Sequence, residues 1–161
     1  MASVQKIVPH LWFEDNVEEA VNFYVSLFGN SAITNVARYG KNGPGPVGSV
    51  MAIGFTLEGQ SFAAINGGKW VTFNGAVSLL VHCDTQNEID RLYDGLLEGG
   101  GKPQQCGWLS DRYGVVWQIN YAKLSEMLAD PDADRAARVM RAMLSMRRID
   151  IAALDAAYRG R

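Results

Sequence analysis

The sequence has little of what several common protein classes require. Its 161 residues include only two cysteines, Cys83 and Cys106, which are too few for a disulfide framework or a zinc site built from cysteine. Two reduced thiols are typical of a cytoplasmic protein. No apolar run approaches the roughly 20 residues that span a bilayer, and the first residues lack the long apolar core of a secretion signal. We therefore expect a cytoplasmic protein that does not enter membranes.

An excess of charge of one sign is also missing. The chain has 15 Lys and Arg against 17 Asp and Glu, a formal net charge of −2. Binding to nucleic acid or to an anionic membrane surface usually requires a basic patch or excess, so we expect neither as a partner. Hydrophobic residues make up 48% of the chain and charged residues 20%. This balance predicts a folded globular protein with its own core.

The first part of the chain predicts one strand, one helix and three further strands. Residues 6–13 are typical of a strand, in which Pro9 favours an edge position. Residues 15–29 predict a helix, because apolar residues recur every three to four positions and Gly29 follows the last of them. The apolar positions are Ala20, Phe23, Tyr24, Leu27 and Phe28. Strands are then expected at 33–39, 48–57 and 61–66.

The same order of elements follows a second time. Residues 76–84 predict a strand, and residues 85–101 contain a helix with Thr85 as N-cap and Glu88 completing a capping box. Short strands are expected near 102–110 and 114–121. The chain therefore contains two similar modules, at 6–66 and 76–121, and the second is the shorter.

Residues 122–161 form a separate helical tail. Asp130 before Pro131 ends one short helix, Asp132 can cap the next, and a third helix is expected at about 150–158. The middle helix carries an apolar stripe, which we expect to pack within the chain or against a second subunit rather than to bind a cofactor. The stripe consists of Ala136, Val139, Met140, Met143, Leu144 and Met146.

One strand carries an unexpected amide. In residues 115–120, Val115, Trp117 and Ile119 share one face of the strand, and Gln118 lies on the other face between Val116 and Asn120. An acid at the position of Gln118 would be able to bind a metal ion or transfer a proton. An amide does neither well, so this position bears directly on the chemistry of the protein.

The sequence resembles the PhnB-like branch of the vicinal oxygen chelate superfamily, which includes glyoxalase I and the bleomycin-resistance proteins. The branch carries the description 3-demethylubiquinone-9 3-methyltransferase. The resemblance rests on "PHLWFEDNVEEAVNFYVSLFG", "RYGKNGPGPVGSV", "INGG", "QCGWLSDRYGVVWQ" and "DPDADRAARVMRAMLSMRRIDIAAL". It implies an α+β fold in which two βαβββ modules form a cup-shaped mixed sheet. Residues 1–121 would then be a single domain, with residues 122–161 packed on it or on a dimer.

The resemblance also locates the positions of the superfamily's metal ligands. Metal enzymes of the superfamily hold a divalent ion in the cup with four side chains, and the ion polarises a substrate with two neighbouring oxygens. The four positions map to Val8, Asn66, Ser78 and Gln118. Valine is not a ligand, and a neutral hydroxyl and two amides hold a transition metal poorly. We therefore expect no metal ion and no other cofactor.

Two histidines lie close to these positions. His10 is two residues from Val8, and His82 is four from Ser78, so each shares a strand face with its neighbour. Three interpretations stay open for the pair: hydrogen-bonded structural histidines, a two-histidine metal site, or contacts to a substrate with acid and base roles. Trp12 shares a face with His10. The candidate ligand pocket is His10, Trp12, Asn66, Ser78, His82 and Gln118.

The functional expectation is therefore a protein that binds a small molecule in the cup and lacks the superfamily metal site. The alternative is an enzyme of this superfamily, of the lyase, isomerase or dioxygenase type, or the methyltransferase of the family description, acting on a small metabolite. The methyltransferase lacks support in the residues, because no strand followed by a glycine-rich turn and a helix is present to hold S-adenosylmethionine. The open sheet edges and the apolar stripe of the tail predict a homodimer.

Overall fold

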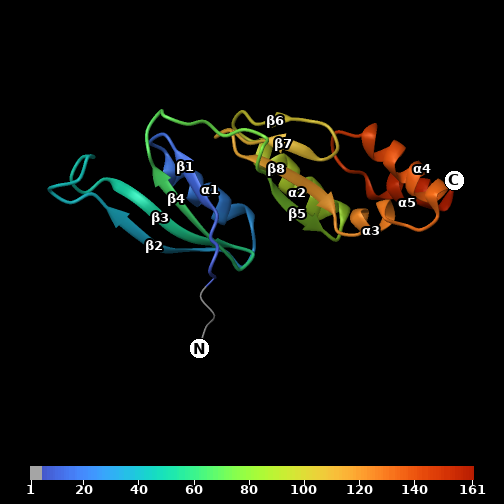
Figure 1. Ribbon diagram of the computed structural model, residues 1–161, viewed down its shortest axis with the longest axis horizontal. Helices are drawn as coiled ribbons and strands as arrows, with labels where there is room; N and C mark the ends of the chain where they lie inside the picture. Colours follow the sequence, from blue (N-terminus) through green and yellow to red (C-terminus); the bar gives the residue numbers. More distant parts are fainter. Residues whose placement is uncertain (1–4) are drawn as a thin grey trace. The chain divides into compact units, whose positions relative to one another are not determined.

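Each of the two predicted modules forms its own four-stranded mixed sheet, with one helix on it (Figure 1). The computed structural model describes residues 5–161. The chain divides into two compact units, one ending at Phe73 and the other beginning at Asn74. The second unit includes the helical tail as well as the second module.

The first unit contains β1 to β4 and α1 in the predicted order. Its strands are arranged β1-β4-β3-β2, with β1 parallel to β4 and the other neighbours antiparallel. β1 begins later than the sequence predicts, because its first ladder contact is the bond that the amide of Ala63 donates to the carbonyl of Pro9. The elements are β1 (His10–Phe13), α1 (Val17–Leu27), β2 (Ala32–Arg38), β3 (Val50–Leu57) and β4 (Gln60–Asn66).

The core of the first unit lies between α1 and one face of its sheet. Phe13, Ile53, Phe55 and Ala64 are buried on this face, which fits the alternation of side chains along a strand. The buried residues of α1 are Val17, Ala20, Val21 and Tyr24. The opposite face of the sheet is not covered by α1 and carries His10 and Trp12, which pair in register with Ala63 and Ile65.

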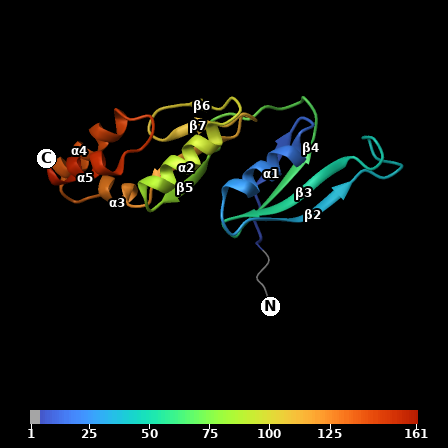
Figure 2. The ribbon, with the colours of Figure 1, turned by 180° about the vertical axis from the view of Figure 1, so that it is seen from behind.

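The second unit repeats this arrangement in shorter strands. The order is β5-β8-β7-β6, with β5 parallel to β8. α2 packs on one face through Ile89, Leu92, Tyr93 and Leu96, and Figure 2 shows α1 and α2 each in front of its own sheet. The elements are β5 (Leu79–Cys83), α2 (Gln86–Leu97), β6 (Lys102–Pro103), β7 (Trp108–Ser110) and β8 (Val116–Tyr121).

The start of α2 follows the predicted capping chemistry with one difference. The Thr85 hydroxyl accepts a hydrogen bond from the Glu88 amide at 3.2 Å, as an N-cap does. The Glu88 carboxylate reaches back one residue further than in a standard capping box and accepts from the Asp84 amide at 3.0 Å. The first bond satisfies an amide that the first turn of a helix leaves without a partner, and the second holds the residue before the cap against that turn.

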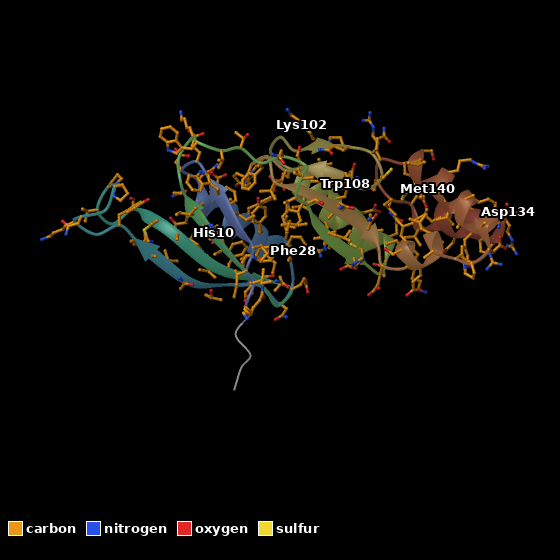
Figure 3. All side chains as sticks on the ribbon, viewed as in Figure 1. His10, Phe28, Lys102, Trp108, Asp134 and Met140 are labelled. Atoms are coloured by element: carbon orange, nitrogen blue, oxygen red, sulfur yellow. The ribbon has the colours of Figure 1, made fainter. Side chains whose placement is uncertain are left out.

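The tail consists of α3 (Leu124–Leu128), α4 (Ala133–Leu144) and α5 (Ile151–Arg159). Asp132 caps α4 by accepting from the amides of Asp134 and Arg135, as predicted. Within the apolar stripe of α4, Val139 is fully buried, whereas Met140 (Figure 3) and Leu144 are 41% and 59% exposed. The stripe therefore packs inside the unit only in part.

No helix among residues 5–161 is long and apolar enough to cross a membrane.

Candidate functional site

The two predicted ligand positions of the second unit lie in contact. Ser78 directly precedes β5, and Gln118 lies in the middle of the neighbouring strand β8. The Gln118 Nε2 donates a hydrogen bond to the Ser78 Oγ at 2.8 Å. Both side chains are half-buried. Since the amide donates to the hydroxyl and neither group is charged, this is a neutral polar pair rather than a pair of charged ligands.

The turn before β8 determines that Gln118 points away from α2. Asp111, only 4% exposed, accepts hydrogen bonds from the amides of Tyr113 and Val115 and from the Trp117 indole at 2.9 Å. These bonds hold Trp117 on the face that α2 covers. Because neighbouring side chains of a strand point to opposite faces, Gln118 lies on the face that α2 leaves open.

Other side chains share this open face of the second sheet. On β5, Leu80 and His82 are exposed, and in register they pair with Gln118 and Asn120 of β8. On β7, Trp108 (Figure 3) pairs with Gln118 and is half-buried. The open face thus combines a polar pair with an aliphatic, an aromatic and an imidazole side chain. Small-molecule sites likewise combine apolar side chains with a few polar groups.

Asn120 contributes an acceptor that has no partner. Its Oδ1 is buried and receives no hydrogen bond from any residue between 5 and 161. Gly107 lies against it, since a Cβ at Gly107 would be 3.3 Å from this oxygen. A buried acceptor without a donor is costly.

The first unit places His10 and Trp12 on the open face of its own sheet. His10 is exposed at the start of β1. Trp12 is half-buried, and its indole donates to the Gly68 carbonyl at 2.9 Å. A Cβ at Gly67 would lie 2.0 Å from the Trp12 ring, so only glycine allows the ring to lie flat against this loop. His10 and Trp12 therefore lie together, as the shared strand face predicted.

Asn66 lies on the other face of that sheet, under α1. It pairs in register with Phe13, which is buried against the helix. Its Oδ1 accepts from the Val17 amide at 2.9 Å, and its Nδ2 donates to the Val50 carbonyl at 3.1 Å. The side chain thus caps α1 and ties the helix to β3, while Asn16, the residue in the cap position, makes no side-chain cap bond. The structure does not bring Asn66 to His10 and Trp12.

The donor set does not fit the divalent ion of the superfamily. Val8 has no donor atom and is 39% exposed, ahead of the start of β1. Asn66 is engaged in capping α1, and Ser78 and Gln118 bond to each other. Across residues 5–161, no three His, Cys, Asp or Glu side chains are placed together as they are in a metal site. Divalent transition metals bind through imidazole, carboxylate or thiolate groups, and this set offers none of them.

The cysteines have different environments. Cys83, at the end of β5, is fully buried, and burial raises the pKa of its thiol to about 12. A thiol with so high a pKa is not a nucleophile near neutral pH. Cys106 is half-buried in the segment before β7.

Sequence reasoning did not single out three residues of the open face. Asn120 was placed on the face of Gln118 but was not singled out, although a second amide two positions further along the strand is a usable signal. Leu80 alternates with Ser78 and His82 and was open to the same argument. The contact of Trp108 with this face depends on the register between β7 and β8, which the sequence does not reveal.

Comparisons with known proteins agree on one family. A family model described as 3-demethylubiquinone-9 3-methyltransferase matches residues 5–120. The solved structure of a putative 3-demethylubiquinone-9 3-methyltransferase, PhnB protein, from Bacillus cereus is 42% identical with a TM-score of 0.68, and the match covers 73% of this chain and 100% of that one. A protein from Pseudomonas aeruginosa is 26% identical with a TM-score of 0.60, covering 74% and 98%. The comparison with curated proteins found no match.

More distant structures agree in fold. The fosfomycin resistance protein FosX from Mesorhizobium loti is 13% identical with a TM-score of 0.57, and the match covers 81% of this chain and 99% of that one. At this identity the likeness concerns the fold alone. Two mixed sheets, each built from a βαβββ module, together with C-terminal helices, constitute the glyoxalase-like vicinal oxygen chelate fold predicted from the sequence.

Proposed function

The chain belongs to the 3-demethylubiquinone-9 3-methyltransferase, or PhnB-like, family, and we propose that it binds a small polar molecule on the open face of its second sheet without a divalent metal ion. The observation that carries this proposal is the hydrogen bond between Gln118 and Ser78. It places a neutral pair at two positions where the resemblance puts ligands of the metal. A neutral hydroxyl and amide suit hydrogen bonding to a ligand and are poorly suited to holding an ion.

The neighbours of the pair support binding of an organic molecule. Leu80 and Trp108 offer apolar surface, and Asn120 offers an unsatisfied acceptor. Small-molecule sites combine mainly apolar walls with a few polar groups that orient the ligand. His82 lies beside Asn120 in register, and an imidazole there supplies either a hydrogen bond or a proton during a reaction.

Methyl transfer, which the family description names, receives no support from these residues. A nucleotide-like cofactor such as S-adenosylmethionine is commonly held where a strand leads through a glycine-rich turn into a helix. Within residues 5–161 the three strand-to-helix connections are Glu14-Asp15-Asn16, Asp84-Thr85 and Ala122-Lys123. None contains glycine, and the first two carry acidic side chains. We therefore place the function in binding, with a reaction at His82 as the alternative that the test below separates.

We also propose that the protein acts as a homodimer. Among residues 5–161, the outer strands of each sheet have an unpaired edge, and an unpaired edge readily accepts another chain. Met140 and Leu144 add exposed apolar surface on α4. Twofold dimers are the most common way of covering such surfaces.

The test is a survey of what the protein carries when it is purified without chelator. Mass spectrometry of small molecules released on denaturation, together with elemental analysis, should find an organic compound and well under one divalent ion per chain. Gln118→Met keeps the size of the side chain but removes its donor, so this variant should lose the compound. Gln60→Met, at an exposed position beside the β3–β4 turn, is the matched control and should retain it.

Two results would contradict the proposal. One zinc, nickel or manganese ion per chain would show that the neutral pair does not exclude a metal. A compound retained equally by wild type, Gln118→Met and Gln60→Met would place the site elsewhere. If the recovered compound is chemically changed by wild type and not by His82→Gln, the function is enzymatic rather than binding.

A further inference from the structure

The family model ends at residue 120, so the three helices of the tail lie outside it. The Bacillus cereus protein is covered in full by 73% of this chain, so about a quarter of this chain has no counterpart there. The tail nevertheless makes close contacts with the second module. These contacts come mainly from residues 146–151, which follow α4 and end at the first residue of α5 and which we name the strap.

The strap is bound to α2 by side chains. Gln86, the first residue of α2, donates through its Nε2 to the Ile149 carbonyl at 3.0 Å and accepts through its Oε1 from the Ile151 amide at 2.9 Å. Arg148 forms ion pairs with Asp90, at 3.1 Å, and with Asp94. Ile149 itself is fully buried.

Arg148 also covers the ring of a buried tyrosine. Its guanidinium lies 4.8 Å from the centre of the Tyr93 ring. Tyr93 is 4% exposed and belongs to the core of α2. One arginine thus joins the strap to two carboxylates and an aromatic ring on a single helix, an arrangement that a planar guanidinium allows.

The other side of the strap is bound to the segment before β7. The amide of Cys106 donates to the Met146 carbonyl at 2.9 Å, and the amide of Gly107 donates to the Arg147 carbonyl at 2.7 Å. Cys106 and Gly107 both have left-handed backbone conformations, with φ of 59° and 80°. Such a conformation is unfavourable for cysteine and persists only where surrounding contacts enforce it. Here the two carbonyls of the strap are among those contacts, together with the bond from the Ile119 amide to the Gly107 carbonyl.

Cys106 and Gly107 lead directly to the open face of the second sheet. The Gly107 carbonyl accepts from the Ile119 amide at 2.8 Å. A Cβ at Gly107 would be 2.9 Å from Ile149 of the strap and 3.3 Å from Asn120 Oδ1. Gly107 therefore lies between the strap and Asn120, and the next residue in the chain is Trp108 of β7.

We propose that the strap is a positioning element: it holds Cys106 and Gly107 in the left-handed conformation and thereby fixes Trp108 and Asn120 on the open face of the second sheet. The part played by Trp108 and Asn120 in binding rests on the proposed function. The claim that the strap holds Cys106 and Gly107 does not depend on it. Gln86 and Arg148 are then positioning residues that act on the open face through the backbone of Cys106 and Gly107.

The two cysteines allow a direct test on the full-length protein. The labelling rate of Cys106 reports local opening of the segment before β7, which the strap holds. Cys83 is buried in the core with a raised thiol pKa, so it reacts only when the module unfolds. Labelling with a maleimide at neutral pH, followed by peptide mass spectrometry, gives both rates in one experiment. In the wild type, the buried Cys83 should react slowly, and the rate of the half-buried Cys106 is the reference against which each variant is compared.

Two variants weaken the strap by different routes. Gln86→Glu keeps the side-chain volume and places an acid in the first turn of α2, where the helix dipole favours it, but it removes the donor to Ile149. Arg148→Ala removes both ion pairs. Each should raise the labelling rate of Cys106 by about tenfold or more, because the segment opens locally, and leave that of Cys83 unchanged. Arg141→Ala, at an exposed position of α4, is the matched control and should change neither.

A second readout follows Trp108 itself. In NMR spectra, the indole signal of Trp108, assigned with Trp108→Phe, should shift in both strap variants. The indole signals of Trp12 and Trp117, which donate to Gly68 and Asp111, should stay in place. A role of the strap in stability alone would not move the Trp108 signal selectively.

Two results would overturn the proposal. Unchanged labelling of Cys106 in Gln86→Glu and Arg148→Ala would show that the strap does not hold this segment. Equal rises for Cys83 and Cys106 would show that the tail supports the whole module rather than the segment. Both readouts are recorded without any bound molecule, so a failure of the small-molecule proposal would leave them unaffected.

Discussion

Replacing Asn66 by alanine should destabilise the protein strongly, although Asn66 was a candidate for the ligand pocket. The substitution removes two hydrogen bonds, from the Val17 amide at 2.9 Å and to the Val50 carbonyl at 3.1 Å. Val17 is fully buried and Val50 is 6% exposed. Loss of a cap costs about 1 kcal/mol, and a buried backbone group left without its partner costs roughly 1–3 kcal/mol. We expect a loss of about 3 kcal/mol in the free energy of unfolding.

The assay is urea unfolding followed by circular dichroism, with thermal unfolding as a second measure. For a chain of this size, 3 kcal/mol corresponds to a decrease in Tm of roughly 6–12 °C. Asn66→Asp should lose about half as much, because a carboxylate still accepts from Val17 at the positive end of α1 but has no proton for Val50.

The matched control is Asn22→Ala. Asn22 is exposed on α1 and, within the described part of the chain, donates only to the Glu18 carbonyl of its own helix. Alanine has the higher helix propensity, so stability should be unchanged or slightly raised. If Asn66→Ala costs no more than Asn22→Ala while ligand binding is lost, Asn66 belongs to the binding site and not to the α1 cap.

Three further predictions concern the turn before β8, the tail and the assembly. Asp111→Ala should cost about 3–4 kcal/mol in urea unfolding, because three donors, including the Trp117 indole, lose a buried carboxylate; a loss below 1 kcal/mol would contradict this. The hydroxyl of Tyr158 lowers the pKa of the Asp130 carboxyl by hydrogen bonding, so this contact stabilises the tail above the ordinary carboxyl pKa near 4 and is lost as the pH falls through the lowered value. NMR signals of α5 should report the loosening, and Tyr158→Phe should weaken its pH dependence. An unchanged pH profile in Tyr158→Phe would refute the assignment. Light scattering at micromolar concentration should give about twice the chain mass of 17.6 kDa, and a monomer mass that persists at high concentration would refute the dimer.

Local chemistry explains which features the sequence predicted. Thr85 and Asp132 were assigned as caps because a hydroxyl or carboxylate before an amphipathic stretch acts within three residues, and the structure confirms both. The outward direction of Gln118 followed from strand alternation beside Trp117. These inferences depend on neighbours in the chain, so the sequence contains the necessary information.

Contacts between distant segments explain what the sequence did not predict. Asn66 caps a helix that begins 49 residues earlier, and its place under α1 follows from the register of β4 with β1. Gln86 binds the strap across 63 residues. Trp108 reaches the open face through the pairing of β7 with β8. Nothing in local periodicity determines such pairings, because they depend on how whole elements pack.

The central claim is that a small molecule binds at the Ser78–Gln118 pair without a metal ion. The most direct measurement is an NMR titration of the labelled protein with a library of small polar metabolites in the presence of EDTA. We predict that at least one compound shifts the side-chain amide signal of Gln118 together with signals of Ser78, Leu80 and His82. Signals that move only after a divalent ion replaces the EDTA, or that move only at residues outside this open face, would contradict the claim.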